Sequence, residues 1–201
     1  MNNRFQIMEK PDWISWDNIR QCLYEAHVVN REKGINMTHY QWPCEKIMDY
    51  VGEKGLILVA LDGKQLIGTA AFAEKDGNLW YNKGRYAYIC FDSVIPKYAG
   101  KGVFKYLDAK REELARQKGY SVLVFDTHSK NIRRREIAVE QGYQYVSFFR
   151  GKNIDHYSVV MAKWLNENPY SRWHCFYFYQ KSRLKTIIKF VLSKLLRSHN
   201  E

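Results

Sequence analysis

Apolar residues along the 201-residue chain recur with two different spacings. Continuous or alternating apolar runs predict strands at residues 4–8, 56–61, 65–73, 85–95, 121–127, 144–149 and 157–162. Apolar residues three and four positions apart predict helices at residues 12–33, 43–52, 103–118 and 131–141. Asp-Gly pairs at 62–63 and 76–77 predict tight turns. This order of elements is typical of an α/β fold in which helices cover a mixed sheet.

Residues 166–201 follow a different pattern from the rest of the chain. Residues 166–171 are turn-like, and residues 172–179 place five aromatic rings and a histidine in eight positions. Residues 181–197 are predicted to form an amphipathic helix. Its apolar stripe consists of Leu184, Ile187, Ile188, Val191, Leu192 and Leu195. We therefore divide the chain into a domain at residues 1–165 and an aromatic and basic amphipathic extension at residues 166–201.

The composition, 46% hydrophobic and 26% charged residues, is that of a folded globular protein. No apolar run reaches the roughly 18 residues of a membrane-spanning helix, and the first residues lack the apolar core of a secretory signal. These features predict a cytoplasmic protein. The four cysteines stand far apart, without a C-x-x-C pair or clustered histidines. This spacing argues against a metal site and against a disulfide framework.

The net charge of +11 is concentrated near the end of the chain. Residues 163–201 contain eight Lys/Arg and two acidic residues, which gives +6. We interpret the helix at 181–197 first as docked on its own domain or on a second subunit, which would make a homo-oligomer. The alternative partner is an anionic membrane surface, which would place the protein at the membrane periphery. Nucleic acid is the least favoured partner, because the sequence contains no recognised nucleic-acid-binding module.

Residues 94–104, with the sequence VIPKYAGKGVF, carry the clearest chemical signal. A predicted strand ends before Pro96, the chain turns through Gly100 and Gly102, and a helix begins at once. Glycines let the backbone approach a bulky anion, and the start of a helix presents N–H groups and a positive dipole end. Lys97 and Lys101 add positive charge. The stretch therefore predicts a site for a pyrophosphate group.

The same stretch resembles motif A of the GNAT acetyltransferase superfamily, V-x-P-x-x-x-G-x-G. Lys97 stands at the position of a usual Gln or Arg, and Gly100 and Gly102 match the glycines. Asn131 then opens a helix that ends at Gly142-Tyr143, which is similar to a later pattern of the superfamily. Over about residues 4–165, the resemblance implies a mixed, largely antiparallel sheet with splayed central strands and covering helices. The C-terminal helical extension lies outside it.

The resemblance implies an acyl-CoA-dependent N-acyltransferase. It would move an acetyl group from acetyl-CoA, the cosubstrate, to a primary amine of a small molecule such as an amino sugar or an amino acid, by direct attack. Asn131 would bind the pantetheine arm or order the site, or would simply cap its own helix. The other implied CoA-binding residues are Asp92, Ser93 and Val94 along the pantetheine, and Lys97, Tyr98, Ala99, Gly100, Lys101, Gly102, Val103 and Phe104 around the pyrophosphate.

Two positions depart from the family pattern. Phe104 is large where many members carry a small residue. Ala138 stands where the family has the tyrosine that protonates the leaving thiolate, so the usual general acid is missing. A thiol is a good leaving group near its pKa of about 8.5, so this loss need not abolish turnover. The alternative is a catalytically degenerate domain that binds CoA or a partner.

Acyl transfer to an amine needs a base, because only the neutral amine is a nucleophile. The candidates are His128, which alternatively is a surface histidine in a loop, and Asp92, which alternatively is a substrate anchor or an ion-pair partner. Cys90 as an acyl-enzyme nucleophile is disfavoured. The loop at residues 35–42, rich in rings and amides, is expected to cover the acceptor.

Overall fold

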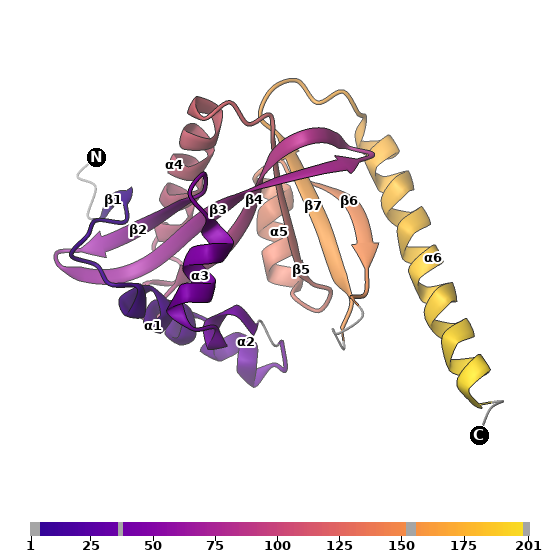
Figure 1. Ribbon diagram of the computed structural model, residues 1–201, viewed down its shortest axis with the longest axis horizontal. Helices are drawn as coiled ribbons and strands as arrows, with labels where there is room; N and C mark the ends of the chain where they lie inside the picture. Colours follow the sequence, from indigo (N-terminus) through magenta and orange to yellow (C-terminus); the bar gives the residue numbers. More distant parts are fainter. Residues whose placement is uncertain (1–4, 36–37, 152–155, 199–201) are drawn as a thin grey trace. The chain divides into compact units, whose positions relative to one another are not determined.

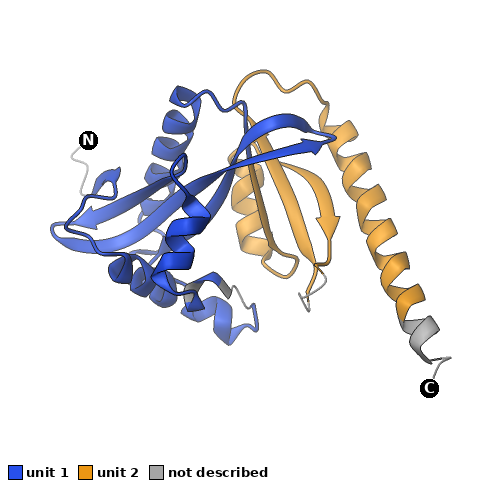
Figure 2. Ribbon diagram, viewed as in Figure 1, with its two compact units in different colours: residues 1–123 blue, residues 124–201 orange. Residues whose placement is uncertain are grey.

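The computed structural model describes residues 5–35, 38–151 and 156–198. The chain divides into two compact units, residues 1–123 and residues 124–201, shown in Figure 2. The boundary falls within strand β5 (Val122–His128). The predicted division at residue 165 stays a prediction.

The first unit is built on an antiparallel sheet (Figure 1). Its strands lie in the order β1 (Gln6–Glu9), β2 (Leu56–Asp62), β3 (Gln65–Leu79) and β4 (Asn82–Val94). Asp62 pairs with Gln65 across the first hairpin, and Gly63 takes the left-handed φ of +61° that this tight turn requires. The predicted turn at 62–63 is thus confirmed.

The second hairpin turns later than the sequence pattern predicts. The Asp76-Gly77 pair is not a turn, because Asp76 pairs with Arg85 and Gly77 with Gly84 inside the ladder. The chain reverses between Leu79 and Asn82 instead. Local turn chemistry is overridden here by cross-strand pairing, which continues as long as both strands find partners.

The predicted helix at 12–33 is two helices, α1 (Trp16–Ala26) and α2 (Val28–Glu32), separated at His27. The first begins at Trp16 because Ser15 caps it in a capping box with Asn18. The unit also contains η1 (Thr38–Gln41), α3 (Cys44–Val51), η2 (Pro96–Tyr98) and α4 (Val103–Gln117). The helix predicted at 103–118 is therefore confirmed.

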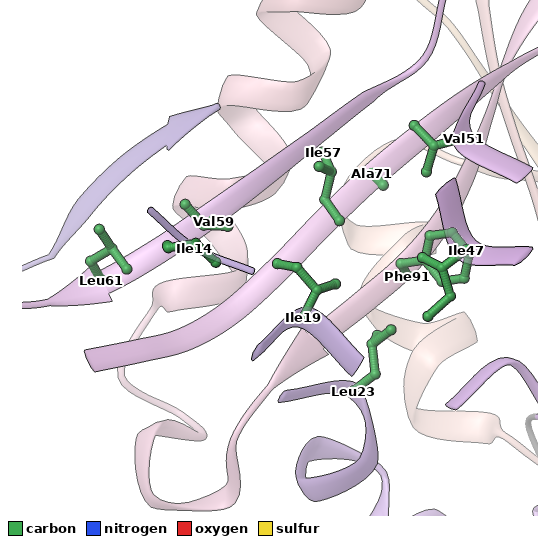
Figure 3. Close-up of a cluster of buried hydrophobic side chains, with 10 residues drawn as sticks. All are labelled: Ile14, Ile19, Leu23, Ile47, Val51, Ile57, Val59, Leu61, Ala71 and Phe91. Carbon is green, nitrogen blue, oxygen red and sulfur yellow. The ribbon is translucent and has the colours of Figure 1, made fainter. Parts of the chain in front are cut away.

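Helices α1 and α3 pack on one face of the sheet, as Figure 3 shows. The apolar side chains of this cluster are Ile14, Ile19, Leu23, Ile47, Val51, Ile57, Val59, Leu61, Ala71 and Phe91. Helix α4 packs close to β3 at Gly68, where an added Cβ would lie 3.3 Å from Leu107 Cδ1 and 2.7 Å from the Ser93 carbonyl oxygen. A side chain at Gly68 would therefore push α4 away from the sheet.

The second unit contains β5, α5 (Ile132–Glu140), β6 (Gln144–Phe149), β7 (Ser158–Trp164) and α6 (Arg172–Ser198). Strand β7 lies between β5 and β6, and β6 is antiparallel to β7. The α/β class with a largely antiparallel sheet, covering helices and a C-terminal helix is confirmed. The splay of the central strands stays a prediction.

Helix α6 is longer than predicted, because the aromatic stretch at 172–179 belongs to it. It packs on β6 within its own unit, where Phe148 N–H donates to Ser182 Oγ at 2.9 Å and Thr186 Oγ1 donates to the Phe148 carbonyl at 3.1 Å. Cys175 and Tyr179 are buried on the same face. The predicted stripe is not this face: Leu184, Ile187, Ile188, Val191 and Leu192 are exposed. Within its own unit, α6 therefore docks on β6 through the face with Cys175 and Tyr179, and not through these five residues of the predicted stripe.

Candidate functional site

The glycine turn follows directly from strand β4. Tyr98 is the last residue of the short helix η2. Its ring is buried and its hydroxyl donates to Asp62 Oδ2 at 2.8 Å, which fixes the turn to the β2–β3 hairpin. Gly100 and Gly102 then take φ values of +74° and +83°, and Gly102 is the N-cap of α4. Both positions need the left-handed region that glycine enters without steric cost. The sequence motif therefore corresponds to a real conformational requirement.

The turn leaves room and charge for an anion. A Cβ added at Gly100 would meet nothing within 4 Å. No side chain caps the start of α4 within the described structure, and its first turn carries no acidic residue. Lys97 and Lys101 are exposed, with their Nζ atoms 5.8 and 4.9 Å from the centre of the Tyr98 ring. Helix N–H groups, open space and two ammonium groups fit a pyrophosphate.

The other residues predicted at the pyrophosphate take different positions. Ala99 is exposed, Phe104 is half-buried, and Val103 is buried under the first turn of α4. Any contact of Val103 with a phosphate would therefore involve its backbone and not its side chain.

Strand β4 contains a bulge at the predicted pantetheine segment. The register with β3 shifts between Thr69 and Ala71, and Phe91 has a left-handed φ of +54°. Buried hydroxyls hold this shape: Thr69 Oγ1 donates to the Phe91 carbonyl at 2.7 Å, and Thr69 N–H donates to Ser93 Oγ at 3.1 Å. A non-glycine residue at positive φ is a strained conformation that is often kept at functional sites.

Asp92 follows the bulge and pairs with a buried arginine. Its carboxylate accepts a hydrogen bond from Arg111 of α4, which also binds Asp108 and the carbonyl oxygen of Ala71. The Arg111 side chain is 0% exposed. A guanidinium stays protonated, so it holds the Asp92 carboxylate in an ion pair. This contact favours the ion-pair interpretation of Asp92 over its use as a base.

The second unit holds His128, Asn131 and Ala138. His128 is buried, its ring stacks on His156 at 4.3 Å between centroids, and its Nδ1 accepts the Lys130 N–H at 2.9 Å. The Nδ1 lone pair is thus engaged, which places the proton of the neutral ring on Nε2. His128 is therefore not a surface side chain, and its contacts favour a role in shaping the loop over a role as a base.

Asn131 is the N-cap of α5, since its Oδ1 accepts the Arg134 N–H at 3.3 Å. Ala138 is fully buried on the same helix. A tyrosine at that position would not fit without displacing its neighbours. Among the residues that the structure describes, no group of three or more His, Cys, Asp or Glu side chains is arranged to hold a metal ion.

Two histidines lie beside the bulge. The sequence pattern does not single out His27, and it places His39 only within the expected acceptor loop at residues 35–42, of which residues 36–37 lie outside the described structure. The ring of His39 lies 5.3 Å from that of His27 and 5.6 Å from that of Phe91. Burial lowers the pKa of His39 to about 3, helped by the charge of His27. Burial also lowers the pKa of His27, although the Asp92 backbone partly opposes this. The two histidines meet because α1, η1 and β4 come together in the fold, so no local sequence motif predicts their contact.

The half-buried His39, with its lowered pKa, should make stability depend on pH. Below pH 6.5 the unfolded chain binds a proton on His39, whereas the folded chain stays neutral there down to about pH 3. The free energy of unfolding is therefore fully retained above pH 6.5 and should fall by up to about 1.4 kcal/mol per pH unit below it. The variant His39→Phe keeps the ring packing without a titrating group. Between pH 7 and pH 5, its free energy of unfolding, measured in urea, should fall by about 2 kcal/mol less than that of the natural chain. An equal loss in both proteins would contradict the buried neutral imidazole.

Comparison with known proteins shows the family to which a chain with this fold and this glycine turn belongs. A model of the Acetyltransferase (GNAT) family matches residues 13–143, which is more than half of the chain. The chain therefore belongs to the GNAT acetyltransferase family and is an acyl-CoA-dependent N-acyltransferase. The resemblance of the sequence motifs is confirmed, and acetyl-CoA is the acyl donor that the family uses.

Solved structures share the fold at low identity. An acetyltransferase from Streptococcus agalactiae is 18% identical, with a TM-score of 0.61, and the match covers 81% of this chain and 99% of that one. The ribosomal-protein-S18-alanine N-acetyltransferase from Escherichia coli is 14% identical, with a TM-score of 0.60 and coverage of 83% and 99%. An aminoglycoside 6'-N-acetyltransferase complexed with coenzyme A is 13% identical, with a TM-score of 0.61 and coverage of 82% and 99%. No curated protein is significantly similar in sequence.

Proposed function

We propose that the chain transfers the acetyl group of acetyl-CoA to a primary amine of a small molecule. The observation that carries the proposal is the turn from Gly100 to Val103, where two left-handed glycines precede a helix start without a described side-chain cap. In this proposal the backbone of residues 97–104 holds the pyrophosphate, with Lys97 and Lys101 as counter-charges. In the same proposal, the backbone of residues 92–94, which follows the bulge at Phe91, runs along the pantetheine arm.

Direct attack of the amine on the thioester is the reaction that these residues support. Cys90, the alternative acyl carrier, lies on β4, where burial and the charge of Asp92 raise the pKa of its thiol. A thiol is a poor nucleophile in that state, because the thiolate is the reactive form. His128 and Asp92 remain the proposed bases from the sequence, although the contacts of both favour structural roles. Cys90→Ala should therefore retain acetyl transfer.

The side chains around the bulge favour acceptors that are not polycations. Edge-on contacts join Phe91 to the rings of His39, Trp42 and Tyr50. Lysines lie over two of these rings, with Lys46 Nζ 4.3 Å from Trp42 and Lys75 Nζ 4.4 Å from Tyr50. An apolar cluster with added positive charge suits an amine whose remaining groups are neutral or anionic, such as an amino acid or an amino sugar.

The test is release of free thiol from acetyl-CoA across a panel of amines. We expect amino acids and amino sugars to give higher kcat/KM values than polyamines and aminoglycosides. The natural chain without an amine and a Gly100→Asp variant serve as controls. If acetyl-CoA binds in calorimetry but no amine accelerates thiol release, the proposed transfer is contradicted.

Asn131 offers a separate test of pantetheine binding. Asn131→Asp keeps the oxygen that caps α5 and removes only the amide donor, whereas Asn131→Ala removes both and should cost about 1 kcal/mol of stability. If the Asn131 amide binds the pantetheine arm, the Asn131→Asp variant should unfold at the same urea concentration as the natural chain. Its kcat/KM should be roughly tenfold lower. Unchanged kcat/KM in this variant would leave Asn131 as a helix cap alone.

A further inference from the structure

Helix α6 presents an apolar face that the described residues of its own unit leave exposed. Trp173 is 81% exposed, Leu184 62% and Val191 48%. At roughly 100° per residue, these three positions fall on one side of the helix, with Tyr177 and Ile188 beside them. All five are exposed. A continuous exposed stripe of this kind marks an interaction surface and not ordinary scattered surface residues.

The opposite face of α6 is already occupied, so the helix does not need to turn its stripe inward. Ser182 and Thr186 bind the backbone of Phe148 in β6, and the ring of Phe190 lies 6.1 Å from that of Tyr157. The Arg150 guanidinium lies 4.2 Å from the Phe190 ring. The helix is therefore anchored through one face while the apolar stripe faces away.

The charges of α6 select the kind of partner. Residues 172–198 contain seven Lys/Arg and no acidic residue. Lys181, Lys185 and Lys189 follow one another at helical spacing along one flank of the stripe, and Arg172 and Arg183 lie along the other. All five are exposed. The apolar face is thus bordered on both sides by positive charge.

A lipid surface satisfies this arrangement better than a second copy of the chain. Two copies in contact through their apolar stripes would bring together two helices whose only charged side chains are Lys and Arg. No acidic residue of either helix would compensate this positive charge. In a bilayer surface, the apolar side chains enter the acyl boundary, while long Lys and Arg side chains reach anionic headgroups. Trp173 and Tyr177 are residue types enriched at that boundary. Among the described residues, no helix has the length and apolar content needed to cross a bilayer.

We infer that α6 binds in the plane of an anionic phospholipid surface and makes this chain a peripheral membrane acetyltransferase. The apolar stripe supplies the contact with the acyl boundary, and the flanking lysines make binding depend on anionic lipid. This role is separate from acetyl-CoA binding, because the residues proposed to bind acetyl-CoA lie outside α6.

Flotation of the full chain with vesicles tests the inference. The chain should float with phosphatidylcholine vesicles that contain phosphatidylglycerol, weakly or not at all with pure phosphatidylcholine, and less well as salt is added. The variant Leu184→Gln/Ile188→Gln/Val191→Gln should lose flotation and keep its circular dichroism spectrum, because all three side chains are exposed. Equal flotation of this variant would overturn the inference.

Charge variants separate a lipid site from general basicity. The variant Lys181→Gln/Lys185→Gln/Lys189→Gln should have a roughly 100-fold lower partition coefficient for anionic vesicles. Each basic residue near the lipid surface raises this coefficient several-fold. A matched triple variant changes the same net charge at exposed lysines of the first unit, Lys64→Gln/Lys83→Gln/Lys118→Gln. It should bind as the natural chain does. Equal weakening by both triple variants would overturn a specific role for α6.

Sedimentation tests whether a second copy of the chain, and not a lipid surface, covers the apolar stripe of α6. We expect the natural chain to sediment as a monomer, and the variant Leu184→Gln/Ile188→Gln/Val191→Gln (the stripe variant) to sediment in the same way. A dimer that the stripe variant dissociates, together with no flotation of the natural chain, would overturn the inference and assign the stripe to a second copy.

Discussion

Replacing Gly100 with Asp should lower the affinity for acetyl-CoA by roughly 100-fold or more, because like charges about 4 Å apart repel by about 4 kcal/mol at an effective dielectric of 20. The new carboxylate would stand in the open space over the turn, where a Cβ meets nothing within 4 Å. Isothermal titration with acetyl-CoA measures the effect.

Gly100→Asn is the matched control for this charge effect. Asn and Asp have nearly the same size, and both tolerate the left-handed conformation that Gly100 adopts at φ +74°. The Asn variant should therefore share any strain and lose much less affinity. Equal losses in the two variants would show that backbone strain, and not anion binding, accounts for the effect.

Replacing Arg111 with Leu should cost about 3–5 kcal/mol of the free energy of unfolding. The substitution removes the cation that pairs with Asp92 and Asp108, so both carboxylates lose the guanidinium that compensates their charge. The Arg111 side chain is wholly buried, so water does not replace the lost contacts. Urea unfolding at pH 7 measures the change.

Arg116→Leu on the same helix provides the comparison. Arg116 pairs with Glu112 at 2.9 Å, but its side chain is 45% exposed, so the pair contributes at most about 1 kcal/mol. A similar cost for both substitutions would mean that burial of the Arg111 network is not what stabilises the fold.

Elements with a strong local pattern could be predicted from the sequence. Helix α4 and the glycine turn before it are encoded by apolar spacing and by two positions whose left-handed φ favours glycine. The Asp76-Gly77 pair shows the limit of such signals, because pairing of β3 with β4 overrode a local turn preference. The first predicted helix likewise divides at His27, whose ring contacts that of His39 outside the predicted segment.

The chemistry of the candidate site was less accessible from the sequence. Asp92 and His128 were found by type and position, but their partners, Arg111 and the Lys130 N–H, depend on the folded backbone. The same holds for His39, whose lowered pKa results from burial against distant segments. A motif identifies where a phosphate fits, whereas protonation depends on long-range packing.

The contact between α6 and β6 also protects the sheet. Strand β6 is the last in its sheet, and the open edge of such a strand is a template for pairing with other chains. Ser182 and Thr186 occupy the backbone N–H and carbonyl of Phe148 at that edge. Cutting the chain before α6 would expose the edge and invite aggregation, whatever the outer face of the helix binds. Loss of solubility in a shortened chain would therefore report on strand pairing, and only substitutions on the outer face report on the partner.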